Sequence, residues 1–175
     1  MGILICGLNG VGKSTLGKML AGRLDWTFID NEDLYFPKTD RTYAYSSPRG
    51  KAEVIRLLEE RIEPDRRFVF AAVKGDYGDK LLSLLDCIVV IDVPREARLA
   101  RVRERSLQKF GDRILAGGDL GEKENAWFAL VESRPEDYVE KWLATVDRPV
   151  IRVDGTLPIE ENVEYLASVV TKTRR

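Results

Sequence analysis

The chain has 175 residues, of which 44% are hydrophobic and 33% charged, and its formal net charge is -1. These values fit a single folded domain spanning residues 1–175, and they argue against disorder and against the basic surface that nucleic-acid binding needs. The absence of histidine and the presence of only two cysteines exclude histidine-based triads, histidine-ligated zinc and zinc sites made of four cysteines.

Nothing in the sequence indicates export or insertion into a membrane. The apolar runs have the length of strands, and the first of them has no charged region before it and no cleavage-like segment after it. Cys6 and Cys87 both lie in runs typical of buried strands, where a cysteine behaves as a small reduced hydrophobe. We therefore expect a cytoplasmic protein without disulfides, monomeric or homodimeric, with no nucleic-acid or membrane partner.

Strand-like and helix-like segments alternate along the chain. Runs of branched and aromatic residues predict strands, and 3.6-residue periodicity predicts helices. The strands are expected at 2–6, 27–29, 68–73, 87–93 and 149–153, and the helices at 13–24, 51–62, 95–110, 122–144 and 159–173. This order predicts an α/β protein with three layers, in which helices cover both faces of a five-stranded parallel sheet. Ligands of such sheets bind beyond the carboxyl ends of the strands.

The first strand leads into a complete phosphate-binding motif, Gly7-Leu8-Asn9-Gly10-Val11-Gly12-Lys13-Ser14. Its glycines let the chain turn sharply, so that backbone N–H groups and the positive end of the next helix surround a polyphosphate. Lys13 can reach the β- and γ-phosphates, Ser14 offers a hydroxyl to Mg²⁺, and Thr15 can bond the α-phosphate. The motif predicts a nucleotide site, with a ligand-free glycine-rich turn as the alternative.

Two polar insertions interrupt the alternation of strands and helices. The first, at about 31–66, is expected to bind the acceptor, and the second, at about 106–126, is expected to be a lid. The glycine cluster at 115–121 in the second insertion has the composition of a hinge within the domain.

Three segments together resemble the nucleoside monophosphate kinase and shikimate kinase group of P-loop kinases. They are residues 7–15, the strand ending Ile91-Asp92-Val93-Pro94 before an arginine-rich helix, and the closing stretch at 150–158. The resemblance covers essentially the whole chain. It implies a P-loop NTPase fold with a mobile lid, and a kinase that uses ATP and Mg²⁺ to phosphorylate a small molecule.

The resemblance also implies roles for four arginines and one turn. Arg101 and Arg105 are expected against the adenine and the transferring phosphates, while Arg113 in the lid and Arg134 after it are expected to clamp the phosphates on closure. Fixed guanidinium groups stabilise the charge of a loose phosphoryl-transfer transition state. Asp154 and Gly155 would contact the base through their backbone. A solvated basic stripe and an ordinary tight turn are the competing interpretations.

The acceptor is predicted from the segment that follows the second strand. Asp30 is expected to hold Mg²⁺ together with Ser14. Asp33 is expected to act as base and substrate anchor, although it could instead cap a short helix. Tyr35 would contact the acceptor. Arg49 and Gly75 complete the expected acceptor site, and Arg41, Tyr43 and Tyr45 are further candidates in the first insertion.

A hydroxyl acceptor is favoured, because a phosphate acceptor needs no carboxylate base. A nucleoside monophosphate kinase remains an alternative. An ATP-binding or ATPase regulatory module with little transfer activity is a third hypothesis, supported by the lack of a clear acidic residue after the third strand. The near-neutral charge opposes a polynucleotide 5′-hydroxyl kinase.

Overall fold

A computed structural model describes residues 1–40 and 42–172. Its centre is a sheet of five parallel strands in the order β2-β3-β1-β4-β5. The strands are β1 (Gly2–Cys6), β2 (Thr27–Asp30), β3 (Phe68–Ala71), β4 (Leu85–Asp92) and β5 (Val150–Asp154). The predicted five-stranded parallel sheet is confirmed, and the strand boundaries differ from the prediction by at most two residues.

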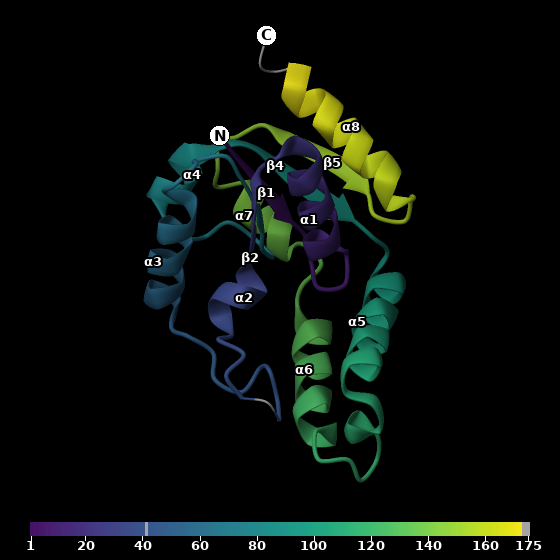
Figure 1. Cartoon of the computed structure of the whole chain (residues 1–175). Coiled ribbons are helices and arrows are strands. Elements are labelled where there is room, and N and C mark those ends of the chain that lie inside the picture. The colour runs from purple at the N-terminus through teal and green to yellow at the C-terminus, as the bar shows by residue number, and fades with distance from the viewer. Residues whose placement is uncertain (41, 173–175) are drawn as a thin grey trace.

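Helices cover both faces of the sheet and confirm the three-layer arrangement (Figure 1). On one face, α1 (Lys13–Leu24) and α8 (Ile159–Lys172) pack together, and their apolar residues share one cluster with β1, β4 and β5. The other face carries α2 (Asn31–Tyr35), α3 (Lys51–Ile62), α4 (Asp79–Leu84) and α7 (Tyr138–Leu143). Because β1 and β3 are buried on both faces, every residue of these strands is apolar or glycine.

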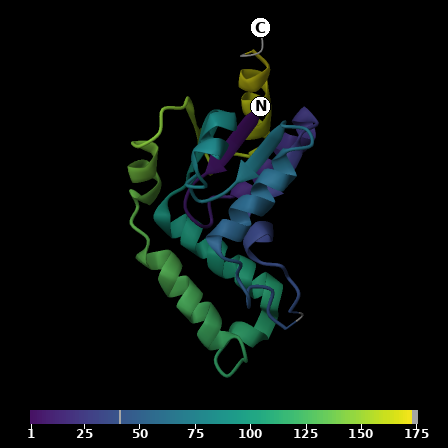
Figure 2. The ribbon, with the colours of Figure 1, turned by 90° about the vertical axis from the view of Figure 1, so that its left-hand side faces the viewer.

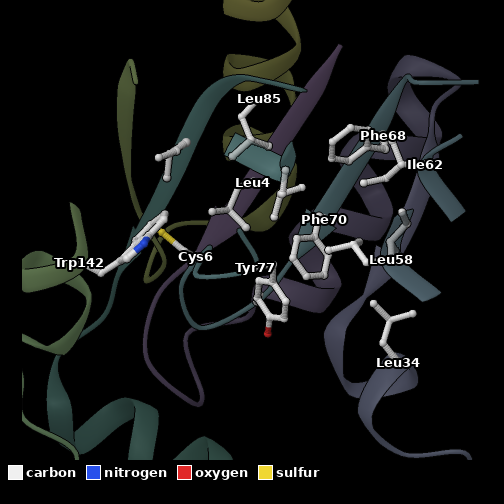
Figure 3. Packing of buried hydrophobic residues seen from close by; sticks show 14 of the residues in the cluster. Leu4, Cys6, Leu34, Leu58, Ile62, Phe68, Phe70, Tyr77, Leu85 and Trp142 are labelled. Atoms are coloured by element: carbon white, nitrogen blue, oxygen red, sulfur yellow. The ribbon is translucent and has the colours of Figure 1, made fainter. Parts of the chain in front are cut away.

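The second apolar cluster fixes the parts of the chain that border the site. Figure 3 shows Leu4 and Phe70 in the sheet between Trp142 of α7 and Leu58 of α3. Tyr77 packs edge-on against Phe70 with ring centroids 5.2 Å apart. This packing ties α3 and α7 to strands that end at the phosphate loop.

A long helical arm extends beyond the carboxyl ends of the strands. It consists of α5 (Arg95–Phe110), the 3₁₀ helix η1 (Gly111–Ile114) and α6 (Gly121–Ser133), which run antiparallel (Figure 2). The glycine cluster at 115–121 forms the turn at its far end, where the N–H of Leu120 donates to the carbonyl of Arg113 at 2.9 Å. The predicted lid at 106–126 therefore corresponds to the outer half of this arm.

The helix predicted at 122–144 is wrong, because the structure has two helices there. The chain leaves α6 at Arg134, whose ψ of 126° is extended, and re-enters a helix at Tyr138. The cause is Pro135, since a residue before proline is driven out of the helical region. The short helices α2 and α4 were not predicted, and the predicted end of the last helix, Thr173, lies outside the described residues. None of the helices in the described part of the chain has the length and apolar character needed to span a membrane.

The segment at 36–50 leaves α2 and runs to the far half of α5 (Figure 2). The Tyr43 ring lies 5.5 Å from that of Phe110, and the Tyr43 hydroxyl donates to the buried carboxylate of Glu124 at 2.7 Å. Arg41 lies outside the described residues. The two predicted insertions are thus in direct contact.

Candidate active site

The loop between β1 and α1 has the backbone geometry of an anion-binding nest. Gly10 and Gly12 have φ angles of +87° and +98°, in the left-handed region that favours glycine. A Cβ on Gly10 would also lie 2.1 Å from the carbonyl oxygen of Arg98 in α5, so a larger residue does not fit. The N–H of Gly7 donates to the carbonyl of Val73 at 3.2 Å and fastens the loop to the end of β3. The loop leads directly into the amino end of α1, and in proteins generally such a helix end attracts anions.

Lys13, the first residue of α1, points back into this loop. Its Nζ donates to the carbonyl of Leu8 at 3.0 Å. The pKa of Lys13 is lowered to about 8, chiefly by burial, and the charges of Arg105 and Arg134 contribute to this lowering while Asp30 opposes it. The ammonium group therefore sits among other cations with a neutral carbonyl as its partner, an arrangement that the arrival of an anion would stabilise.

A cavity of about 400 Å³ opens beside the loop. It is bordered by the phosphate loop, the ends of β2 and β3, the helix α2 and the inner faces of α5 and α6. The residues that line it are Asn9, Gly10, Gly12, Lys13, Ser14, Thr15, Asp30, Asn31, Glu32, Tyr35, Phe36, Ala71, Ala72, Val73, Arg101, Val102, Arg105, Trp127 and Arg134.

Two carboxylates line the wall of this cavity that comes from β2 and α2. Asp30 ends β2, and its Oδ1 accepts from the N–H of Glu32 at 2.9 Å, which caps the amino end of α2. Glu32 accepts a hydrogen bond from the Tyr45 hydroxyl at 3.0 Å on Oε1, and its Oε2 lies 3.9 Å from Nη1 of Arg105. Asp33 lies outside the cavity, where its half-exposed carboxylate pairs with Lys38. The helix is capped by Asp30 and not by Asp33.

Three of the four predicted arginines line the same cavity. Arg101 donates from both terminal nitrogens to the carbonyl of Gly155 at 3.1 Å. Arg134 donates to the side chain of Asn9 in the phosphate loop. Arg105 projects from α5 towards Glu32. Arg113 lies apart from them at the outer end of the arm. There it forms a bidentate salt bridge with Asp119, donating from Nε and Nη2 to the two carboxylate oxygens at 2.9 and 2.7 Å.

A second cavity, of about 290 Å³, continues on the other side of the phosphate loop and shares Gly12, Thr15 and Arg101 with the first. Its far wall includes Gly155 in the turn after β5. A Cβ on Gly155 would lie 2.5 Å from Val93, so this turn stays close to the sheet only with glycine. Two cavities that lie on either side of the phosphate loop have room for a nucleoside, its phosphates and a second molecule.

Three other predicted residues have structural contacts away from the two cavities. Arg49 donates to the carbonyl of Leu34 at 2.8 Å and so ties the end of the 36–50 segment to α2. Gly75 lies against the core, where a Cβ would be 2.6 Å from Leu4 and 2.8 Å from Trp142. The carboxylate of Asp154 accepts from the backbone and hydroxyl of Thr156 at 2.8 and 2.6 Å, forming the turn.

Glu32 and Phe36 also line the main cavity, although no role was expected for either of them from the sequence. Tyr45, one of the tyrosines expected to suit the acceptor, contacts both. A signal for Glu32 was present, because an aspartate cap at position 30 puts residue 32 in the first turn of the helix. Trp127 in α6, one residue beyond the predicted lid at 106–126, lines the cavity as well.

The oxygen ligands that Mg²⁺ prefers are present at the main cavity, where Ser14 and Asp30 share its wall. The described residues contain no group of three or more acidic or cysteine side chains that could hold a metal by itself. This donor set fits Mg²⁺, which binds through one or two protein oxygens together with substrate phosphates and water.

No family model matches the chain. It is 31% identical over 178 residues to the uncharacterized protein YqaC of Bacillus subtilis, covering 95% of this chain and 97% of the relative. A shikimate kinase from Aquifex aeolicus has a similar structure, with a TM-score of 0.58, 19% identity, and coverage of 99% of this chain and 98% of its own. A deoxyadenosine kinase from M. mycoides also has a TM-score of 0.58, with 12% identity and coverage of 99% and 100%. The resemblance to the P-loop small-molecule kinase group is confirmed at the level of the fold.

Proposed function

We propose that this chain, which belongs to the same family as the uncharacterized protein YqaC of Bacillus subtilis, transfers the γ-phosphate of ATP to a hydroxyl group of a small molecule. The observation that carries the proposal is a single cavity with the phosphate loop on one wall and two carboxylates, Asp30 and Glu32, on another. This arrangement can hold a phosphoryl donor and an acceptor base within the same volume.

The donor half of the site is formed by the phosphate loop and the second cavity. The loop N–H groups and Lys13 would bind the phosphates. The cavity between Thr15, Arg101 and Gly155 would hold the nucleoside. Mg²⁺, held by Ser14 and Asp30, would neutralise charge on the phosphates. Arg105 and Arg134 would stabilise the charge on the transferring group.

In the acceptor half, we assign the base role to Glu32 in place of Asp33. Glu32 lines the cavity, whereas Asp33 lies outside it and pairs with Lys38. Asp30 already uses one oxygen to cap α2, which suits a metal ligand better than a mobile proton acceptor. Glu32 would orient the attacking hydroxyl and take up its proton.

The acceptor wall favours a hydroxyl compound over a nucleoside monophosphate. A phosphate on the acceptor would meet the carboxylates of Asp30 and Glu32, whereas hydroxyl groups would donate to them. Arg49, which the sequence analysis placed near the acceptor, is held against the carbonyl of Leu34. Tyr35, Phe36 and Trp127 add ring surfaces to the cavity, so we propose an acceptor with both hydroxyl groups and an apolar face.

The test is ADP release from Mg-ATP with single acceptors: adenosine, deoxyadenosine, shikimate, gluconate, glucose, ethanolamine and nucleoside monophosphates. We expect acceptor-dependent ADP with a hydroxyl compound and little without one. Glu32→Gln should lower the rate at least about 100-fold, whereas the matched variant Asp33→Asn should leave it near the wild-type rate. ATP binding with no acceptor-dependent ADP would favour the ATPase or switch hypothesis, and activity on monophosphates alone would favour the nucleoside monophosphate kinase.

A further inference from the structure

The carboxylate of Glu32 is held in place by groups that come from two distant parts of the chain. Tyr45, in the segment at 36–50, donates to Oε1 at 3.0 Å. Arg105, in α5, lies 3.9 Å from Oε2. The two oxygens of the proposed base are therefore distinguished, since one is engaged by a neutral donor and the other faces a guanidinium group.

Tyr45 is itself held by a cation of the arm. Nζ of Lys109, in the last turn of α5, donates to the Tyr45 hydroxyl oxygen at 2.8 Å and lies 4.1 Å from the centre of its ring. The Tyr45 hydroxyl thus accepts from Lys109 and donates to Glu32. Each hydrogen bond in such a chain polarises the next, so the ammonium group strengthens the bond that Tyr45 makes to the carboxylate.

The ring of Tyr45 is fixed by other aromatic rings. Those of Phe36, Tyr43 and Phe110 lie 5.1, 5.6 and 6.1 Å from it, in edge-on orientations. Burial raises the pKa of Tyr45, and the charge of Glu32 raises it further, so the hydroxyl keeps its proton at neutral pH. Tyr45 is therefore a rigid and permanent donor.

We propose that Tyr45 is a positioning residue for phosphoryl transfer, orienting Glu32 through a hydrogen-bond chain anchored at Lys109. This inference rests on the proposed function. As the acceptor oxygen bonds to the γ-phosphorus and the bond from that phosphorus to the bridging oxygen breaks, the hydroxyl proton passes to Oε2 of Glu32. Tyr45 holds Oε1 and keeps its own proton. ADP leaves with the bond electrons.

A consequence is that the base takes its orientation only while the 36–50 segment is docked on the arm. Lys109 belongs to α5 and Tyr45 to the segment, and the hydrogen bond between them is lost if the two separate. The hydrogen-bond chain therefore couples acceptor activation to the arrangement of both insertions.

The first variant is Tyr45→Phe, which removes the hydroxyl and keeps the ring. The assay uses whichever of the acceptors named above gives the fastest ADP release with the wild-type protein. With it, kcat should fall about 10-fold, because one hydrogen bond to a charged group is lost. The KM for ATP and the calorimetric affinity for Mg-ATP should stay unchanged. Tyr165→Phe makes the same chemical change at an exposed ring in α8, away from Glu32 and the 36–50 segment, and it should keep the wild-type kcat.

A double-mutant cycle distinguishes an effect of Tyr45 on the orientation of Glu32 from a general loss of order in the 36–50 segment. In a Glu32→Gln background, the additional Tyr45→Phe change should lower kcat less than about 2-fold, because the oriented base is already gone. Additive effects, or a wild-type kcat in Tyr45→Phe, would overturn the inference while leaving the kinase proposal intact. If the wild-type protein phosphorylates no acceptor, the proposed function fails, and this inference fails with it.

Discussion

ATP affinity should depend on the protonation of Lys13, and the structure gives the pH range. Burial sets the pKa of Lys13 at about 8 without nucleotide. Bound phosphates favour the ammonium form, so they raise this pKa on binding. Between pH 7 and pH 9 the protonated fraction of the free protein falls from about nine-tenths to about one-tenth. The Kd for Mg-ATP should therefore rise about tenfold over this range, or about 1.4 kcal/mol.

The assay is isothermal titration calorimetry with Mg-ATP at pH 7, 8 and 9, in buffers with different ionisation enthalpies. At pH 9 the heats should show uptake of nearly one proton per nucleotide bound. Few other groups titrate in this range, because the chain has no histidine and burial raises the thiol pKa values of Cys6 and Cys87 to about 12 and about 11. Lys13→Met should bind more weakly and lose the pH dependence. A wild-type Kd that is equal at pH 7 and pH 9, or the same pH slope in Lys13→Met, would refute the reasoning.

Three further predictions concern stability. Because the pKa of Lys13 in the folded protein lies below its ordinary value of 10.5, its charge destabilises the fold at pH 7, and this cost disappears as the pH rises from about 8 to 10.5. Lys13→Met should therefore raise the free energy of unfolding of the nucleotide-free protein by about 1–3 kcal/mol in urea titrations at pH 7. Tyr43→Phe should lower that free energy by about 1–3 kcal/mol, because Oε2 of the buried Glu124 already has no partner in the described structure and Oε1 would lose its donor. In a Glu124→Gln background the same change should cost less, and equal costs would contradict this. Gly75→Ala should destabilise by about 1–3 kcal/mol, because its Cβ would overlap Leu4 and Trp142. A change in KM for the acceptor without a change in stability would instead place Gly75 at the acceptor.

The phosphate loop could be predicted from sequence because its chemistry is local. The glycines at 7, 10 and 12 and the start of α1 at Lys13 follow from a single strand–loop–helix unit. The sheet could be predicted as well, since its apolar runs are continuous. Pro135 indicated a break within residues 122–144. The prediction of one continuous helix there followed the 3.6-residue apolar periodicity instead.

The choice among the acidic residues after β2 could not be made from sequence. Asp30, Glu32 and Asp33 lie within one short helical turn, and which of them faces the cavity depends on how the burial of Leu34 rotates α2 against the core. The burial of Glu124 could not be predicted from the sequence either, because a glutamate at the start of a helix usually faces solvent. Its position depends on Tyr43, a residue 81 positions away.

The distribution of tryptophans gives the protein an internal optical reporter. All three lie in the described part of the chain: Trp26 packs in the α1–α8 cluster, Trp142 packs in the core beside Gly75, and Trp127 in the arm lines the main cavity. Replacing Trp26 and Trp142 by phenylalanine would leave one indole whose emission reports on the cavity. Stopped-flow fluorescence of that variant would follow the arrival of nucleotide at the cavity, and would test whether the arm moves on binding, without any attached dye.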